Sequence, residues 1–89
     1  MIERELMVAN KLGLHARATA KLVQVLSGYK SGATLSAKGR EVNAKSIMGV
    51  MLLAAGQGTP VTLRVDGADE AEAAAAVSDL FERLFDEGG

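Results

Sequence analysis

The stretch 33–44, ATLSAKGREVNA, places two short runs of β-like residues on either side of Lys38 and Gly39. Glycine can supply the positive φ that a tight turn between antiparallel strands needs. The stretch therefore predicts a β-hairpin formed by residues 33–37 and 40–44. This hairpin lies near the middle of the chain, and the elements predicted on either side of it set the fold class.

The segment after the hairpin predicts a helix, a strand and a second helix. Ser46 stands before an apolar run, 47–55, in the position of an N-capping serine, and Gly56 ends that run. Apolar and polar side chains alternate over 61–66, as in a half-buried strand. The last helix is predicted to begin near Asp69.

Acidic residues near the start of this last helix have a structural interpretation. Asp69 and Glu72 have the spacing of a capping box, so we assign them to capping and to pairing with the helix dipole rather than to catalysis. One apolar stripe follows them along the helix, formed by Val77, Leu80, Phe81, Leu84 and Phe85.

The segment before the hairpin predicts a strand, a loop and a helix. Charged and apolar residues alternate over 2–9, the loop covers 10–13, and apolar residues recur at helical spacing from Ala16 until Ser27 and Gly28. The element order is then β-α-β-β-α-β-α over a single domain, residues 1–89. Such an order most simply makes a four-stranded sheet with the helices packed on one face.

Composition and charge exclude several classes of function. The 89 residues contain no cysteine, which excludes disulfides and thiolate metal sites, and the N-terminal residues resemble no signal peptide. The uncharged stretch 46–63 is broken by glycines and a proline, so we expect no membrane insertion and a cytoplasmic protein. Residues 1–45 carry a net charge of +5 and residues 46–89 a net charge of −6, yet without basic runs or stacking aromatics we expect no nucleic-acid partner.

The single histidine, His15, stands directly before the first predicted helix. The unpaired N–H groups of Ala16, Arg17 and Ala18 would face its ring, with the positive end of the helix dipole behind them. The dipole and the Arg17 charge disfavour the imidazolium form and so keep a nucleophilic lone pair free. The same N–H groups and the guanidinium would bind phosphate oxygens. The residues alone equally allow a histidine that only caps a helix.

Two segments give the chain a resemblance to a known family. Residues 13–17, GLHAR, and 45–51, KSIMGVM, resemble the two signature segments of the HPr family of the bacterial phosphotransferase system. The resemblance spans nearly the whole chain and includes the element order. It implies an α/β (α+β) open-faced sandwich with a four-stranded antiparallel sheet and three helices on one face.

The resemblance also implies a function and its residues. His15 would accept a phosphoryl group on Nδ1, as a pros-phosphohistidine, with Arg17 stabilising the phosphate. The donor would be phosphorylated enzyme I and the acceptors IIA-type proteins, so the chain would be a carrier rather than an enzyme. No metal and no organic cofactor is implied, and we expect a monomer. The family commonly has proline where this chain has Ala18, a departure shared with some carriers of the nitrogen-related branch.

The second predicted helix has two further roles by the same resemblance. Ser46 coincides with the family's regulatory serine, the substrate of HPr kinase/phosphorylase, and a phosphate there would add about two negative charges at a helix N-terminus. The helix is apolar almost all round, so some of its apolar surface should stay exposed. Ile47, Met48 and Met51 would form a docking patch for partner proteins.

Three alternatives differ in what happens at His15. A carrier of the nitrogen-related branch would pass the phosphoryl group to a regulatory IIA protein. A non-phosphorylated interaction module would bind regulators through the second helix and use Ser46 alone as its switch. A small hydrolase of acylphosphatase-like layout would turn over a phosphate ester, but we find no residue that could position its water.

Overall fold

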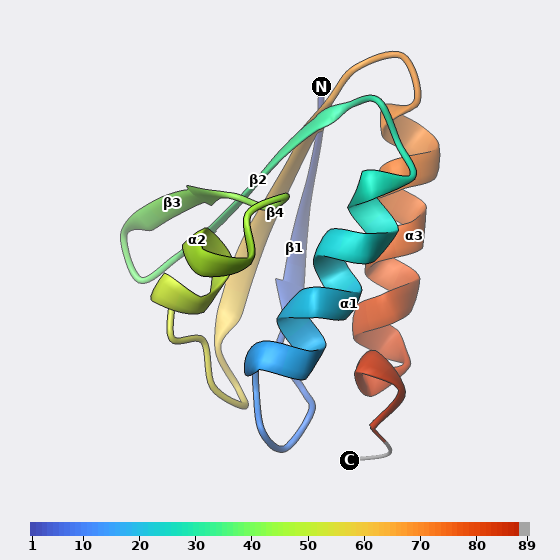
Figure 1. Ribbon diagram of the computed structural model, residues 1–89. Helices are drawn as coiled ribbons and strands as arrows, with labels where there is room; N and C mark the ends of the chain where they lie inside the picture. The colour runs from blue at the N-terminus through green and yellow to red at the C-terminus, as the bar shows by residue number, and fades with distance from the viewer. Residues whose placement is uncertain (88–89) are drawn as a thin grey trace.

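The computed structural model describes residues 1–87 and forms a two-layer sandwich of helices on a sheet (Figure 1). The predicted element order is confirmed, with one short 3₁₀ helix, η1, added after the last α-helix. The elements are β1 (Ile2–Met7), α1 (Ala16–Ser27), β2 (Gly32–Ala37), β3 (Arg40–Asn43), α2 (Ile47–Leu52), β4 (Pro60–Asp66), α3 (Glu70–Glu82) and η1 (Leu84–Asp86).

The four strands form one antiparallel sheet in the order β1-β4-β2-β3. Leu63 of the central strand β4 lies between Arg4 of β1 and Leu35 of β2 in the register. Residues directly opposite each other share a face of the sheet. The face that carries Leu63 and Leu35 is buried, whereas the other face carries polar and charged side chains such as Arg64 and Thr62.

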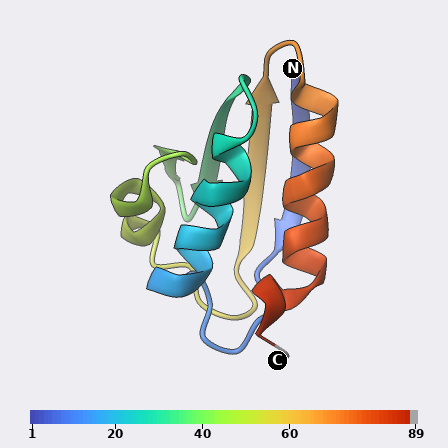
Figure 2. The ribbon, with the colours of Figure 1, turned by 45° about the vertical axis from the view of Figure 1, so that its right-hand side comes forward.

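The helices cover the apolar face and leave the other face open, as predicted. Helix α1 packs against both α2 and α3, and α3 lies over β1 and β4 (Figures 1 and 2). The core between the layers is built mainly from aliphatic side chains, with Phe81 and Phe85 as its aromatic members. No helix within residues 1–87 is long and apolar enough to cross a membrane.

The hairpin at the centre of the sequence forms as predicted. Lys38 and Gly39 both have positive φ, +54° and +78°, which is the conformation of a two-residue hairpin turn. Helix α2 is shorter than predicted, because it ends at Leu52 rather than Ala55. The chain leaves the helix at Ala54, whose φ is +50°, so Gly56 does not end the helix.

The predicted capping box at the start of α3 is wrong. Asp69 makes no side-chain hydrogen bond to the N-terminus of α3. Its carboxylate instead accepts hydrogen bonds from the backbone N–H groups of Lys30 and Ser31, at 2.8 and 2.9 Å, and from the Ser31 hydroxyl. These bonds, led by that of the Ser31 hydroxyl, lower the pKa of Asp69 to about 2. Asp69 therefore joins the α1–β2 connection to the start of α3.

We expect the Asp69→Asn variant to be less stable than the unmodified protein at neutral pH. The folded state lowers the pKa of Asp69 from 3.8 to about 2, so the stabilisation is complete above pH 3.8 and is lost as the pH falls toward 2. Urea unfolding between pH 7 and pH 2 should show the difference between the two proteins shrinking over that window. Glu72→Gln, the other half of the predicted box, is the control, and a difference that does not depend on pH would contradict the assignment.

Candidate functional site

The loop between β1 and α1 is fixed by close contact with the segment that follows α2. Gly13 has a φ of +67°, and a Cβ atom built on it would lie 2.6 Å from the carbonyl oxygen of Ala55 and 2.7 Å from the Cα of Gly56. The N–H of Leu14 donates to the same Ala55 oxygen at 2.9 Å. The buried Thr19 hydroxyl donates to the Leu14 carbonyl at 3.1 Å. The backbone that enters α1 is therefore held on both sides.

His15 is the N-cap residue of α1, as the sequence predicts. Its backbone is extended, with φ −76° and ψ 179°, and its carbonyl accepts the first helical hydrogen bond, from Thr19 at 2.9 Å. The ring turns back over the helix, and Nδ1 accepts a hydrogen bond from the N–H of Arg17 at 3.3 Å. The side chain is 27% exposed. The ring therefore has one nitrogen at the positive end of a helix and an edge open to other molecules.

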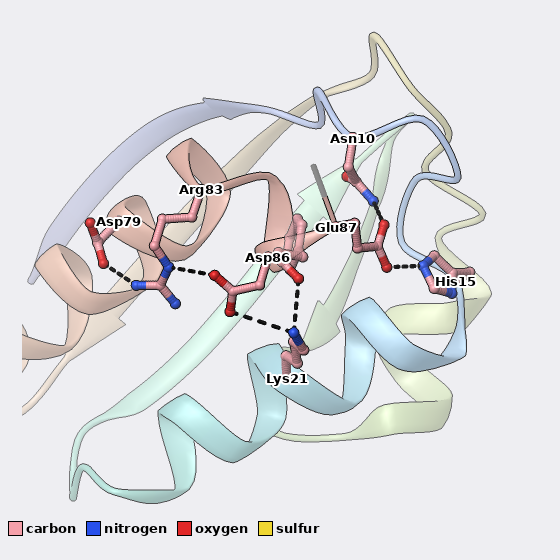
Figure 3. A network of polar contacts seen from close by, with 8 residues as sticks. Asn10, His15, Lys21, Asp79, Arg83, Asp86 and Glu87 are labelled. Carbon is pink, nitrogen blue, oxygen red and sulfur yellow. Dashed lines mark hydrogen bonds and ion pairs between the residues drawn. The ribbon is translucent and has the colours of Figure 1, made fainter. Parts of the chain in front are cut away.

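The second ring nitrogen contacts a carboxylate from the other end of the chain. Nε2 of His15 contacts Oε2 of Glu87, while Oε1 of Glu87 accepts from Nδ2 of Asn10 at 2.9 Å (Figure 3). The same Nδ2 donates to the Gly13 carbonyl at 2.8 Å. Both partners of Nδ2 are acceptors, which fixes the orientation of the buried Asn10 amide. The Asn10 amide, helped by the His15 ring, lowers the pKa of Glu87 below its usual value.

A left-handed turn brings Glu87 to this position. Leu84, Phe85 and Asp86 have φ values of +56°, +54° and +61°, a conformation that costs an L-residue about 1–2 kcal/mol. Burial of Phe85, whose ring centroid lies 4.8 Å from that of Phe81, opposes this cost. Lys21 of α1 donates to the Phe85 carbonyl at 3.1 Å and contacts Asp86 at 3.4 Å (Figure 3). These contacts join the segment after α3 to α1.

Cationic side chains line a pocket next to Glu87. Lys11, Arg17 and Lys21 line a pocket of about 460 Å³ together with Leu12, Asp86 and Glu87. Arg17 lies exposed in the first turn of α1, directly after the helix start. Of the three backbone N–H groups predicted to face the ring, that of Arg17 makes the hydrogen bond to Nδ1, while Ala16 and Ala18 occupy the neighbouring positions of the turn.

Helix α2 has the predicted serine cap and the predicted exposed apolar side chains, and it packs beside α1. The Ser46 hydroxyl accepts a hydrogen bond from the N–H of Gly49 at 3.1 Å, so Ser46 is the N-cap. Ile47, Met48 and Met51 are exposed, Met48 by 77%. Leu52, which is not part of the predicted patch, extends this apolar surface with an exposure of 63%. The expectation that α2 leaves apolar surface uncovered is confirmed.

The sequence alone does not reveal two residues that contact each other beside His15, Asn10 and Glu87. Asn10 reads as an ordinary loop residue, and Glu87 lies 72 positions from His15 in a segment predicted only as the end of a helix. No local spacing connects them, because the contact depends on the left-handed turn and on how α3 packs beside α1. The Gly88-Gly89 tail lies outside the residues that the structure describes.

The fold and the site define a class of protein: an open-faced sandwich in which a lone histidine caps a helix and one ring nitrogen accepts a hydrogen bond at the helix N-terminus. The comparisons with known proteins agree with that class. A family model described as PTS-HPr, "PTS HPr component phosphorylation site", matches residues 2–83. The chain belongs to the HPr family, the phosphocarrier proteins of the phosphotransferase system.

Individual relatives match over the full length. The phosphocarrier protein HPr of Xylella fastidiosa (strain 9a5c) is 68% identical over 87 residues, which cover 98% of each chain. The crystal structure of HPr-C-His from Thermoanaerobacter tengcongensis superposes with a TM-score of 0.94 at 45% identity, covering 98% of both chains. A crystal structure of an HPr dimer from the same organism gives a TM-score of 0.76 at 45% identity, with coverage of 96% and 98%.

We expect Gly13→Ala to lower the free energy of unfolding by about 2 kcal/mol or more, since the new Cβ would be strained in φ and would overlap the Ala55–Gly56 backbone. Gly39→Ala is the matched control, because Gly39 also has positive φ but has nothing within 4 Å of its Cβ position. Urea unfolding curves of both variants measure the difference. Equal losses in the two variants would show that the close approach at Gly13 contributes nothing.

Proposed function

We propose that Nδ1 of His15 accepts a phosphoryl group from phosphorylated enzyme I and donates it to IIA-type proteins of the phosphotransferase system. The observation that carries this proposal is the hydrogen bond from the N–H of Arg17 to Nδ1, at 3.3 Å. A nitrogen that accepts a hydrogen bond carries a lone pair rather than a proton, and that lone pair is the nucleophile. The membership of the HPr family supports the same assignment.

The transfer makes one bond to phosphorus and breaks another. The lone pair of Nδ1 forms the N–P bond, while the bond between phosphorus and its donor atom on enzyme I breaks and leaves its electron pair with that atom. The phosphoryl oxygens then lie at the N-terminus of α1, where the N–H groups of the first turn and the Arg17 guanidinium stabilise negative charge. Transfer to a IIA-type protein reverses these steps, so the chain acts as a carrier without a product of its own.

The exposed apolar surface of α2 is the proposed docking site for both partners. Ile47, Met48 and Met51 lie on a helix that packs against α1, whose N-cap is His15. Methionine side chains adapt to differently shaped partners, which suits a surface that must bind a donor and an acceptor in turn. We propose that the carrier works as a monomer in the cytoplasm, with this surface free to exchange partners.

Ser46 is the proposed regulatory site. Its hydroxyl already lies at the N-terminus of α2 as the capping acceptor, so a phosphate placed there by HPr kinase/phosphorylase would lie among backbone N–H groups. The added negative charge would lie beside Ile47 and Met48 of the docking surface. It would weaken docking of any partner that presents acidic groups to that surface.

Incubation with labelled phosphoenolpyruvate and enzyme I tests the acceptor residue. We expect one acid-labile, base-stable phosphate on the unmodified protein and none on His15→Ala, read by intact mass. Arg17→Ala should lower the rate of labelling by about tenfold, because it removes a charge-assisted contact with the phosphoryl group. Arg64→Ala, which removes a guanidinium from the open face of the sheet, should label at the normal rate.

Two results would contradict the proposal. Absence of enzyme I-dependent label on the folded, unmodified protein would exclude the relay and favour an interaction module. Retention of the label by His15→Ala would place the acceptor on another residue.

A further inference from the structure

We propose that Glu87, oriented by Asn10, is a positioning residue that holds the proton of the His15 ring on Nε2 and stabilises the positive charge that the ring gains when Nδ1 is phosphorylated. This inference rests on the proposed function of His15. It concerns the second nitrogen of the ring and residues that lie outside the two signature segments.

The two hydrogen-bonding neighbours of the ring specify one arrangement of its protons. Nδ1 faces a donor, the N–H of Arg17, and so must present its lone pair. Nε2 faces Oε2 of Glu87, a carboxylate oxygen, and so must present its proton. A ring protonated on Nδ1 alone would set a donor against the Arg17 N–H and a lone pair against the carboxylate. The nucleophilic tautomer is therefore the one that both contacts favour.

The carboxylate is charged and fixed before any partner binds. Asn10, which is fully buried, holds Oε1 at 2.9 Å and keeps the pKa of Glu87 below its usual value. The Glu87 side chain is only 12% exposed. The other charged groups around it are Arg17, Lys21 and Lys11, which line the same pocket, and Asp86, which pairs with Lys21. Because the Asn10 amide donates to Oε1 and Arg17 adds a positive charge nearby, Glu87 remains ionised beside the ring.

In the proposed transfer the ring gains a positive charge, which a carboxylate at Nε2 would stabilise. A neutral ring that attacks phosphorus through Nδ1 while keeping its proton on Nε2 becomes a phosphorylated imidazolium, with one positive charge. The Glu87 carboxylate lies on the nitrogen that carries the proton, so it stabilises this charge more than it stabilises the neutral ring. In the reverse transfer the electron pair of the N–P bond returns to Nδ1 and the ring is neutral again. The proton stays on Nε2 throughout.

The construction of the C-terminal segment supports a role beyond stability. Leu84, Phe85 and Asp86 adopt left-handed conformations in succession, and this turn is what directs Glu87 toward α1 rather than into solvent. Strained backbone persists where the surrounding structure fixes it, and here the buried Phe85 and the contacts of Lys21 do so. The result is a contact between residues 72 positions apart.

The first test reads the ring directly and needs no phosphorylation. The ¹⁵N chemical shifts of the His15 ring, recorded at alkaline pH, report which nitrogen carries the proton. The unmodified protein should show a protonated Nε2 and an unprotonated Nδ1. In Glu87→Ala the two shifts should move toward each other, whereas the matched control Glu82→Ala, which removes an exposed carboxylate from α3, should match the unmodified protein. Unchanged shifts in Glu87→Ala would overturn the proposal.

The second test reads the transfer. We expect Glu87→Ala to lower the maximal rate of phosphorylation by enzyme I about tenfold while the concentration of carrier at half-maximal rate changes little, because docking is intact. Glu87→Gln should show a similar loss, since its amide must point an N–H at one of two donors, Nε2 of His15 or Nδ2 of Asn10. A normal maximal rate in both variants would overturn the proposal. If the unmodified protein takes no phosphate at all, the relay fails, while the shift measurement still decides the role of Glu87.

Discussion

The ring of His15 is held between a backbone N–H on one nitrogen and a carboxylate on the other. Two separate parts of the chain keep these neighbours in place. The N–H belongs to the first turn of α1, whose start is fixed by the close approach of Gly13 to the Ala55–Gly56 backbone. The carboxylate belongs to Glu87, which a strained turn after α3 places next to His15. The proposed role of His15 as a nucleophile depends on such fixed surroundings.

The sandwich places His15 and the exposed apolar side chains of α2 away from the open face of the sheet. Helices α1 and α2 belong to the helical layer (Figure 1), so His15 at the start of α1 and the exposed apolar side chains of α2 lie on that side of the molecule. The open face of the sheet is occupied instead by ion pairs such as Arg64 with Glu3 and Glu41. A partner docked on α2, as proposed, would therefore reach His15 without contacting the open face of the sheet. The proposed carrier would then use one surface of this 89-residue chain for both its donor and its acceptor.

The sequence predicts the features that depend on local pattern. The hairpin turn at Lys38–Gly39, the cap at Ser46 and the position of His15 before α1 follow from turn chemistry and helical spacing, and the structure confirms them. The failures share a physical cause. Asp69 binds Ser31 rather than its own helix, because tertiary partners compete with local capping, and α2 ends early at a left-handed Ala54 that no propensity marks. Glu87 could not be found because its contact requires the packed layers.

The proposed roles of the two His15 ring nitrogens are tested most directly by identifying the nitrogen that carries the phosphate. After phosphorylation of ¹⁵N-labelled protein by enzyme I, the coupling between phosphorus and the ring nitrogens assigns the N–P bond. We predict that the N–P bond forms at Nδ1, with a proton on Nε2 beside Glu87. A bond at Nε2 would contradict it, because that nitrogen is the one that the structure places against the carboxylate.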